Sequence, residues 1–297
     1  MEKVNKEGWP ISFKQLLTAT KEGNEYVGCG NPNASILIIA SEPAIDLKKE
    51  PKTEREKRDE ERHRWEIIEN NEKWHKWLTN GVSEIIVHDG VIDDISKFSP
   101  RFPYKGQKYS VRSEVKKDEV THIRSMAGTS RTWYNYQKLL DLVRGVNRSK
   151  AELLDFHDWC FTSELNTCCA KKSSEVDEEG RRSSIAKRAG KSNRFFSSDF
   201  FQGFPIVIVA SRNYVHRYRD VFSVGELFGF PADSKRVMSV PTRKGGRNRH
   251  LDIYTRQGDS PKLLICCTHF ANRISEEYMK AIASMIREFC AENKIQI

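Results

Sequence analysis

The segment from Asn33 to Asp46, NASILIIASEPAID, predicts a buried strand that ends in an acidic turn. We expect the strand over Ser35 to Ile39, because isoleucine and leucine in succession are typical of strands buried on both faces of a parallel sheet. Glu42 follows this run, and Pro43 closes the turn. Ligands of open α/β sheets bind just outside the carboxyl ends of strands. Glu42 is therefore a candidate catalytic carboxylate, and a loop glutamate with only structural contacts is the alternative.

Three further apolar runs resemble this strand, and each ends in polar residues. They are WCFTSEL at 159–165 before Asn166, FPIVIVA at 204–210 before Ser211, and KLLICC at 262–267 before Thr268 and His269. Helical spacing of apolar residues follows from Thr132 and again from Ser275. Strands alternating with helices predict an α/β fold, with three α/β/α layers around a central, mostly parallel four-stranded sheet.

The residues between about 47 and 129 differ in composition from the rest of the chain. They begin with a mixed-charge run, in which Thr53 and Glu56 form a capping box for a long helix. Asp89-Gly90 between apolar residues predicts a β-hairpin. We interpret residues 47–129 as a charged insertion or lid within a single domain that spans residues 1–297.

The net charge of +9 and the isoelectric point near 9.1 favour an anionic partner. Residues 235–250 hold six Lys or Arg and no Asp or Glu, and residues 170–194 hold eight against four acids. No apolar run approaches the roughly 20 residues of a membrane span, and no secretory signal opens the chain. We therefore expect a protein of the cytoplasm or nucleoid that binds nucleic acid and no membrane.

The seven cysteines include no C-x-x-C pair, which argues against a zinc or iron–sulfur site. Buried free thiols are the simpler interpretation. We expect neither a metal nor a cofactor.

The four strand ends would place Glu42, Asn166, Ser211 and His269 along one edge of the sheet. This set suits cleavage of an N-glycosidic bond on a flipped nucleotide. A carboxylate can position water and stabilise the oxocarbenium-like sugar, and an imidazole, neutral or cationic, can stabilise the departing base anion. An amide offers a donor and an acceptor to a base edge, and basic loops can hold phosphates while the base is unstacked.

The order of these motifs resembles the uracil-DNA glycosylase superfamily. The similar segments are GNPNASILIIASEP from Gly30, ELNTCC around Asn166, FPIVIVASRN around Ser211, and LLICCTHFANR around His269. The resemblance implies that Glu42 positions the water, Asn166 reads the base edge and His269 stabilises the leaving base. It also implies the DNA contacts, which are Ser211 and Arg212 on phosphate, with Phe270 and Arg273 entering the duplex.

The chain departs from that pattern at Ala40 in place of glycine, at Glu42 in place of Asp or Asn, and at Phe270 in place of proline. The base-stacking aromatic is not defined, and Trp133 and Tyr134 are the candidates. The prediction is a monomeric, monofunctional DNA glycosylase that hydrolyses uracil or a related damaged base from single- or double-stranded DNA. A catalytically inactive nucleic-acid-binding protein with the same fold is the alternative. A hydrolase of free nucleosides or nucleotides fits the extensive basic loops less well.

Overall fold

The structure is a computed structural model of the chain. It describes residues 8–23, 25–43, 64–80, 87–88, 91–92, 99–103, 107–111, 113–117, 120–124, 128–168, 177–190, 195–241, 248–272 and 274–297.

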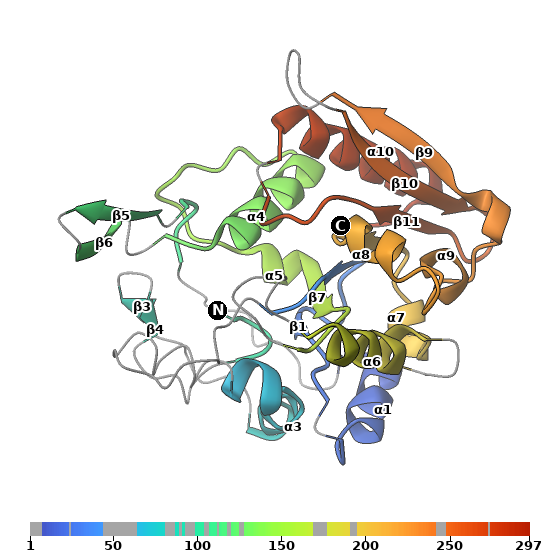
Figure 1. Cartoon of the computed structure of the whole chain (residues 1–297), viewed down its shortest axis with the longest axis horizontal. Coiled ribbons are helices and arrows are strands. Elements are labelled where there is room, and N and C mark those ends of the chain that lie inside the picture. The colour runs from blue at the N-terminus through green and yellow to red at the C-terminus, as the bar shows by residue number, and fades with distance from the viewer. Residues whose placement is uncertain are drawn as a thin grey trace.

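A mixed seven-stranded sheet forms the centre of the described structure (Figure 1). Its strands, in spatial order, are β1 (Cys29–Gly30), β7 (Cys160–Glu164), β2 (Ile36–Ala40), β8 (Ile206–Val209), β11 (Lys262–Cys266), β10 (Arg249–Arg256) and β9 (Arg236–Val240). The four strands expected from the sequence, β7, β2, β8 and β11, are neighbours and run parallel. The remaining pairings, β1 with β7, β11 with β10 and β10 with β9, are antiparallel.

The prediction of a four-stranded, mostly parallel sheet is therefore wrong, although the α/β class is confirmed. Three strands were missed because their sequences lack a long apolar run. β1 has only two residues, and β10 reads RHLDIYTR, in which charged residues interrupt the buried positions. β1 forms because its backbone groups pair with β7, which is distant in the sequence, whereas β9 and β10 pair antiparallel with the strand next along the chain.

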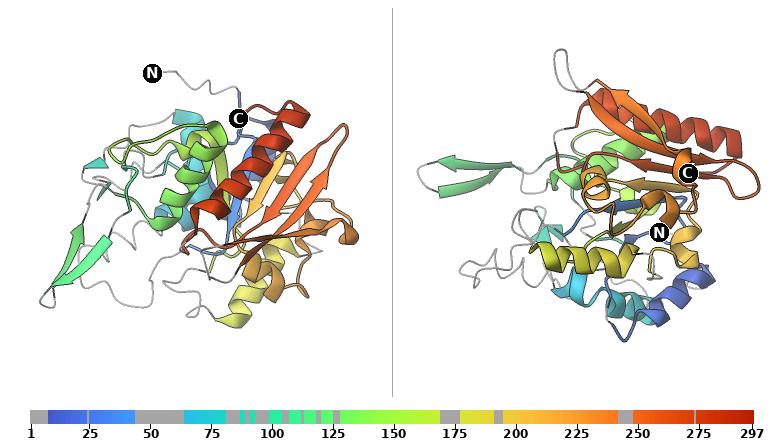
Figure 2. Two further views of the ribbon diagram at one scale, coloured as in Figure 1. Left: turned by 90° about the horizontal axis from the view of Figure 1, so that it is seen from above. Right: turned by 45° about the vertical axis from the view of Figure 1, so that its right-hand side comes forward.

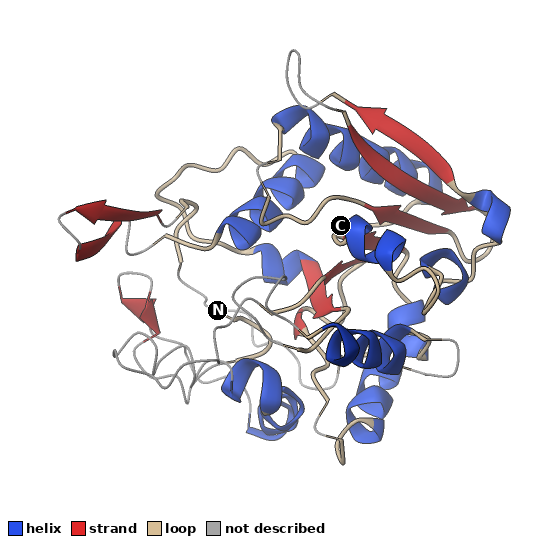
Figure 3. Ribbon diagram, viewed as in Figure 1, coloured by secondary structure: helices blue, strands red, loops and turns tan. Residues whose placement is uncertain are grey.

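Helices lie on both faces of the sheet (Figures 2 and 3). They are α1 (Ile11–Ala19), α3 (Asn70–Asn80), α4 (Arg131–Arg144), α5 (Phe156–Trp159), α6 (Glu178–Ala189), α7 (Asp199–Gln202), α8 (Arg212–Arg217), α9 (Val224–Leu227) and α10 (Glu276–Asn293). Strand β2 shows why both faces are covered, because its side chains alternate between two cores. Leu37 and Ile39 join the aromatic core under α1 and α7, and Ile36 and Ile38 join the core under α4 and α10.

Local signals in the sequence explain where the two longest helices begin. The Ser130 side chain accepts a hydrogen bond from the Trp133 amide at the start of α4, and Ser275 does the same for the Tyr278 amide in α10. Gly145 ends α4 with a positive φ of 70°, a conformation that glycine adopts without strain. At α1, which begins at Ile11 after Pro10, no side chain caps the amino end.

Part of the predicted insertion is described, and it packs on the domain through its helical portion. A π-helical turn at Arg64–Ile68 leads into α3, whose Asn70 side chain accepts hydrogen bonds from the amides of Val27 and Gly28. Trp74 is fully buried. The capping box at Thr53 lies outside the described residues.

Two short hairpins follow in the same segment. β3 (Val87–His88) pairs antiparallel with β4 (Val91–Ile92), which confirms the hairpin predicted from Asp89-Gly90. β5 (Ser113–Lys117) pairs antiparallel with β6 (Val120–Arg124). None of the helices in the described ranges has both the length and the apolar character needed to cross a bilayer.

Candidate functional site

The candidate site lies at the carboxyl edge of the parallel strands, where β2 and β8 are neighbours. The hydroxyl oxygens of Ser41 and Ser211 lie 2.7 Å apart across these two strand ends. The Asn166 amide donates to the Ser41 carbonyl at 2.9 Å, and the Arg212 amide donates to the Cys267 carbonyl at 2.9 Å. Backbone contacts thus hold the four strand ends together, as the sequence predicts.

Glu42 is the carboxylate at the centre of this edge, and it is 9% exposed. The Tyr214 hydroxyl donates a hydrogen bond to Glu42 Oε2. Asn166 Nδ2 donates to the same oxygen over 3.4 Å. The structure therefore brings Glu42 and Asn166 together and adds a tyrosine that the sequence analysis missed. The first turn of α8 was the available signal, because it places Tyr214 three residues after Ser211 on the inward side.

Contacts from α6 and the end of α8 hold Tyr214 in position. The ring of Tyr218 packs edge-on against the Tyr214 ring, with centroids 5.4 Å apart. The Arg181 guanidinium lies 5.2 Å from the centre of the Tyr214 ring and donates to the Tyr218 hydroxyl at 3.2 Å. Because Arg181 is only 2% exposed, this support is part of the interior. Tyr214 consequently presents its hydroxyl to Glu42 from a packed ring.

Asn166 is fully buried, and both ends of its amide have partners within the protein. Its Nδ2 faces Glu42, and its Oδ1 accepts a hydrogen bond from the Cys168 amide at 2.9 Å. The second contact fixes which end of the amide is the oxygen. In this conformation the donor end is the one directed into the site.

His269 follows β11 and lies near enough to Glu42 for the carboxylate to affect its titration. Burial lowers the pKa of the imidazole below its ordinary value, and Glu42 opposes that shift. Its Nδ1 accepts a hydrogen bond from the Ala271 amide at 3.1 Å. A neutral ring with an accepting Nδ1 carries its proton on Nε2. The structure thus favours a neutral His269 at pH 7 that donates through Nε2.

The Arg212 guanidinium pairs with Asp252 of β10. Its Nη2 and Nε lie 3.0 and 3.1 Å from the two carboxylate oxygens. His216 Nε2 lies 2.8 Å from the same carboxylate. Burial opposes ionisation of Asp252, but the hydrogen bonds from Arg212 and His216 hold its pKa below the ordinary value. The Arg212 guanidinium therefore takes part in an ion pair within the protein, whereas Ser211 lies at the end of β8.

The structure does not place Phe270 where it could enter a duplex, contrary to the role implied by the resemblance. Its side chain is fully buried and packs edge-on against Tyr136, with ring centroids 5.3 Å apart. Asn135 Nδ2 donates a hydrogen bond to the Phe270 carbonyl oxygen at 2.6 Å. An apolar ring after a strand is buried when the loop turns inward, as it does here. Arg273 lies outside the described residues.

The two candidate stacking aromatics lie on α4 and have partners in the protein. The Trp133 ring meets Phe156 and His157, with centroids 5.9 and 5.6 Å away. Tyr134 stacks on Tyr109 at 4.5 Å. Both rings therefore take part in packing around α4.

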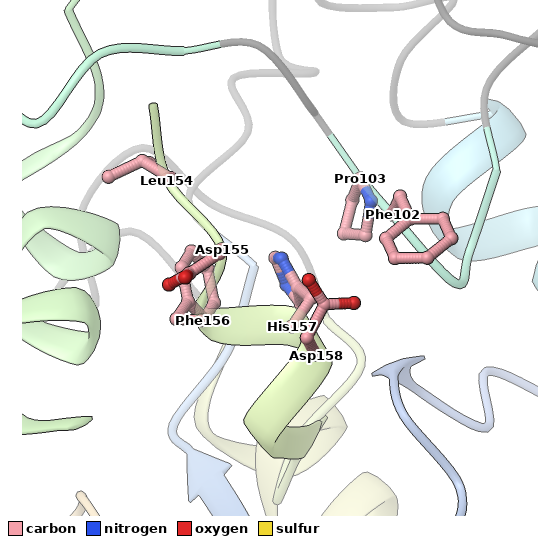
Figure 4. Close-up of a pocket in the computed structure, with 7 residues that line it drawn as sticks. All are labelled: Phe102, Pro103, Leu154, Asp155, Phe156, His157 and Asp158. Atoms are coloured by element: carbon pink, nitrogen blue, oxygen red, sulfur yellow. The ribbon is translucent and has the colours of Figure 1, made fainter. Parts of the chain in front are cut away.

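A small cavity opens at the other end of β7 (Figure 4). It encloses about 20 Å³, which is room for water rather than a nucleobase, and is lined by Phe102, Pro103, Leu154, Asp155, Phe156, His157 and Asp158. Residues 154–158 precede β7, whereas Asn166 follows it, so this cavity is separated from Glu42 by the length of the strand. It is not part of the candidate site.

The described residues include no group of three or more His, Cys, Asp or Glu side chains arranged to hold a metal ion. No family model, no curated protein and no solved structure matches the chain.

Proposed function

We propose that the protein is a DNA glycosylase that hydrolyses the N-glycosidic bond of uracil or a related damaged base. The observation that carries the proposal is the contact between Glu42 and Asn166 at the carboxyl edge of the sheet, where Asn166 Nδ2 lies 3.4 Å from Glu42 Oε2. His269 is close enough to the Glu42 carboxylate to interact with it electrostatically. The net charge of +9 supports a polyanionic substrate.

Each group has a distinct part in the proposed reaction. Glu42 orients the attacking water and stabilises positive charge on the sugar, because a carboxylate near a developing cation lowers its energy. Neutral His269 donates from Nε2 to the departing base as negative charge grows on it. Asn166 donates from Nδ2 to a carbonyl oxygen of the base. The water adds to the sugar carbon as the bond to the base breaks, and the base leaves with the proton that the water loses.

A second candidate is a nucleic-acid-binding protein with this fold that does not cleave. The observation that favours it is that the polar groups of the edge satisfy one another. Tyr214 and Asn166 both donate to Glu42, and Cys168 donates to the Asn166 oxygen. A bound base and water would have to replace some of these contacts.

Base release from defined oligonucleotides distinguishes the two candidates. Labelled single- and double-stranded DNA with one uracil, hypoxanthine or mispaired thymine is incubated with the protein, and alkali then cleaves any abasic site. Loss of the catalytic groups in Glu42→Gln and His269→Ala should each lower the rate by about 10²- to 10⁴-fold. Glu277→Gln is the matched control, since Glu277 is exposed on α10.

Activity on one substrate that depends on Glu42 would support the glycosylase. Binding without base release on every substrate would favour the second candidate. Cleavage that persists in both variants would exclude this assignment of the site.

A further inference from the structure

The two outermost strands, β10 and β9, form a basic surface that the proposed reaction does not use. In the described sheet β9 pairs only with β10, so its outer edge is not paired (Figure 1). Lys235 and Arg236 are exposed, and so is Val237, at 52%. No Asp or Glu occurs between residues 235 and 250. Along β9 the positive charge is therefore not offset by neighbouring acids in the strand.

One end of this hairpin lies beside the candidate site. β9 runs parallel to β11, because both are antiparallel to β10, and the end of β9 and the start of β10 therefore lie at the carboxyl edge. The Tyr278 hydroxyl links the start of β10 to the residues after β11, since it accepts a hydrogen bond from the Thr268 amide and donates one to the His250 carbonyl. Arg249, the first residue of β10, is consequently close to the loop that carries His269.

Arg249 differs from Arg212 and Arg217, which have carboxylate partners. Its Nη1 is buried and has no hydrogen-bond partner in the described part of the chain. By contrast, Arg212 is paired with Asp252, and Arg217 with Glu178 at 2.8 Å. A buried guanidinium nitrogen without a partner is unfavourable unless an anion completes its hydrogen bonding. Lys235 and Arg236 likewise make no ion pair with any described residue.

We propose that the β9–β10 hairpin binds the phosphate backbone of the strand whose base is released at Glu42, an inference that rests on the proposed function. Arg249 binds the phosphate nearest the site, and Lys235 and Arg236 bind phosphates farther along. Arg249 pairs with Val240, and the four residue steps from Val240 to Arg236 span about 13 Å. That length corresponds to roughly four nucleotides along one strand of a DNA duplex, at about 3.4 Å each.

An acidic peptide added to the free edge of β9 is the competing occupant. The position of Arg249 favours phosphate instead, because the guanidinium with the unpartnered nitrogen lies at the catalytic edge rather than along the free edge.

Salt-dependent binding of a fluorescein-labelled single-stranded 15-mer tests this surface in the full chain. The variants are Lys235→Gln with Arg236→Gln, and Arg249→Gln alone. Each lost phosphate contact should reduce the slope of log K against log salt concentration by about 0.7, so the expected reductions are about 1.4 and about 0.7. Matched controls are Lys14→Gln with Lys21→Gln and Arg287→Gln, all at exposed positions, which should retain the wild-type slope.

Arg249→Lys separates charge from folding, because it keeps the cation and should recover most of the slope. Circular dichroism checks that each variant is folded. If the hairpin variants have the same salt slopes as the controls, the proposal that this surface binds phosphate is wrong, and the glycosylase proposal is unaffected. Displacement of the DNA by poly-glutamate at equal charge concentration would also overturn phosphate binding, in favour of an acidic polypeptide. A third outcome combines reduced slopes in the hairpin variants with no base release by the wild-type protein. It would retain the surface as a binding site and refute the glycosylase proposal.

Discussion

The hydroxyl oxygens of Ser41 and Ser211 lie 2.7 Å apart and join the carboxyl ends of β2 and β8. At this point the strand order reverses, since the chain passes from β2 to β7 on one side and later returns to β8 on the other. Crevices at such reversals are where open α/β sheets bind ligands. Glu42 follows Ser41, and Tyr214 lies in the helix that follows Ser211. The reversal therefore explains how two groups 172 residues apart form one hydrogen bond.

Tyr214 should act through Glu42. Hydrogen bonds to charged groups contribute about 1.5–3 kcal/mol, so Tyr214→Phe should slow base release by roughly ten- to hundredfold. The double variant with Glu42→Gln should be no slower than Glu42→Gln alone, because the carboxylate that Tyr214 orients is already absent. Single-turnover rates of all four proteins complete the cycle. Additive effects would show that Tyr214 acts independently of Glu42.

Phe270 should contribute to stability rather than to DNA distortion. Its ring is fully buried, and truncation of a buried phenylalanine typically costs about 3–5 kcal/mol, so Phe270→Ala should lower the free energy of unfolding by that amount. Ile11→Ala is the control, because Ile11 is 75% exposed and its truncation should change stability by less than about 0.5 kcal/mol. Denaturant unfolding measures both. A stable Phe270→Ala protein with weakened duplex binding would instead support the duplex-entering role.

Arg212 should stabilise the fold by compensating Asp252. Removal of one partner from a buried ion pair typically costs about 3–5 kcal/mol, and Arg212→Gln leaves Asp252 with only its His216 contact among the described side chains. Because the pKa of Asp252 is lowered in the folded state, its stabilising contribution exists above the ordinary aspartate pKa and is lost as the pH falls through the folded-state value. The effect of Arg212→Gln on unfolding should therefore be large at pH 7 and small in acid. An equal effect at both pH values would contradict this role.

His157 should make the protein less stable as the pH falls below about 6.5. Burial, together with the nearby charge of Arg101, holds the pKa of its imidazole well below the ordinary value. Between the folded and unfolded pKa values the unfolded chain binds more protons, so stability rises with pH in that window and is constant above it. Each pKa unit of lowering corresponds to about 1.4 kcal/mol.

The variant His157→Phe removes this titration and should flatten the dependence of unfolding free energy on pH between about 5 and 7. His250→Gln is the control, since His250 is exposed, and it should keep the wild-type dependence. Equal pH dependence in His157→Phe and wild type would assign the effect to other groups.

The sequence alone determined the features that depend on neighbouring residues. Apolar runs specified β2, β7, β8 and β11, because a strand buried on both faces needs an apolar side chain at nearly every position. Ser130 and Ser275 specified helix starts through hydrogen bonds to amides three residues ahead. The positions of Glu42 and Asn166 at strand ends followed from the same runs.

Only the tertiary structure decided the features that depend on distant partners. β1 has only two residues, and it is a strand because β7 supplies its hydrogen bonds, with Cys29 opposite Thr162. Phe270 is buried because its loop turns toward Tyr136. The Arg212 guanidinium forms an ion pair because Asp252 of β10 lies within hydrogen-bond distance. The contact of Tyr214 with Glu42 requires β8 to lie beside β2. Such contacts join residues that are far apart along the chain, so no local pattern of side chains encodes them.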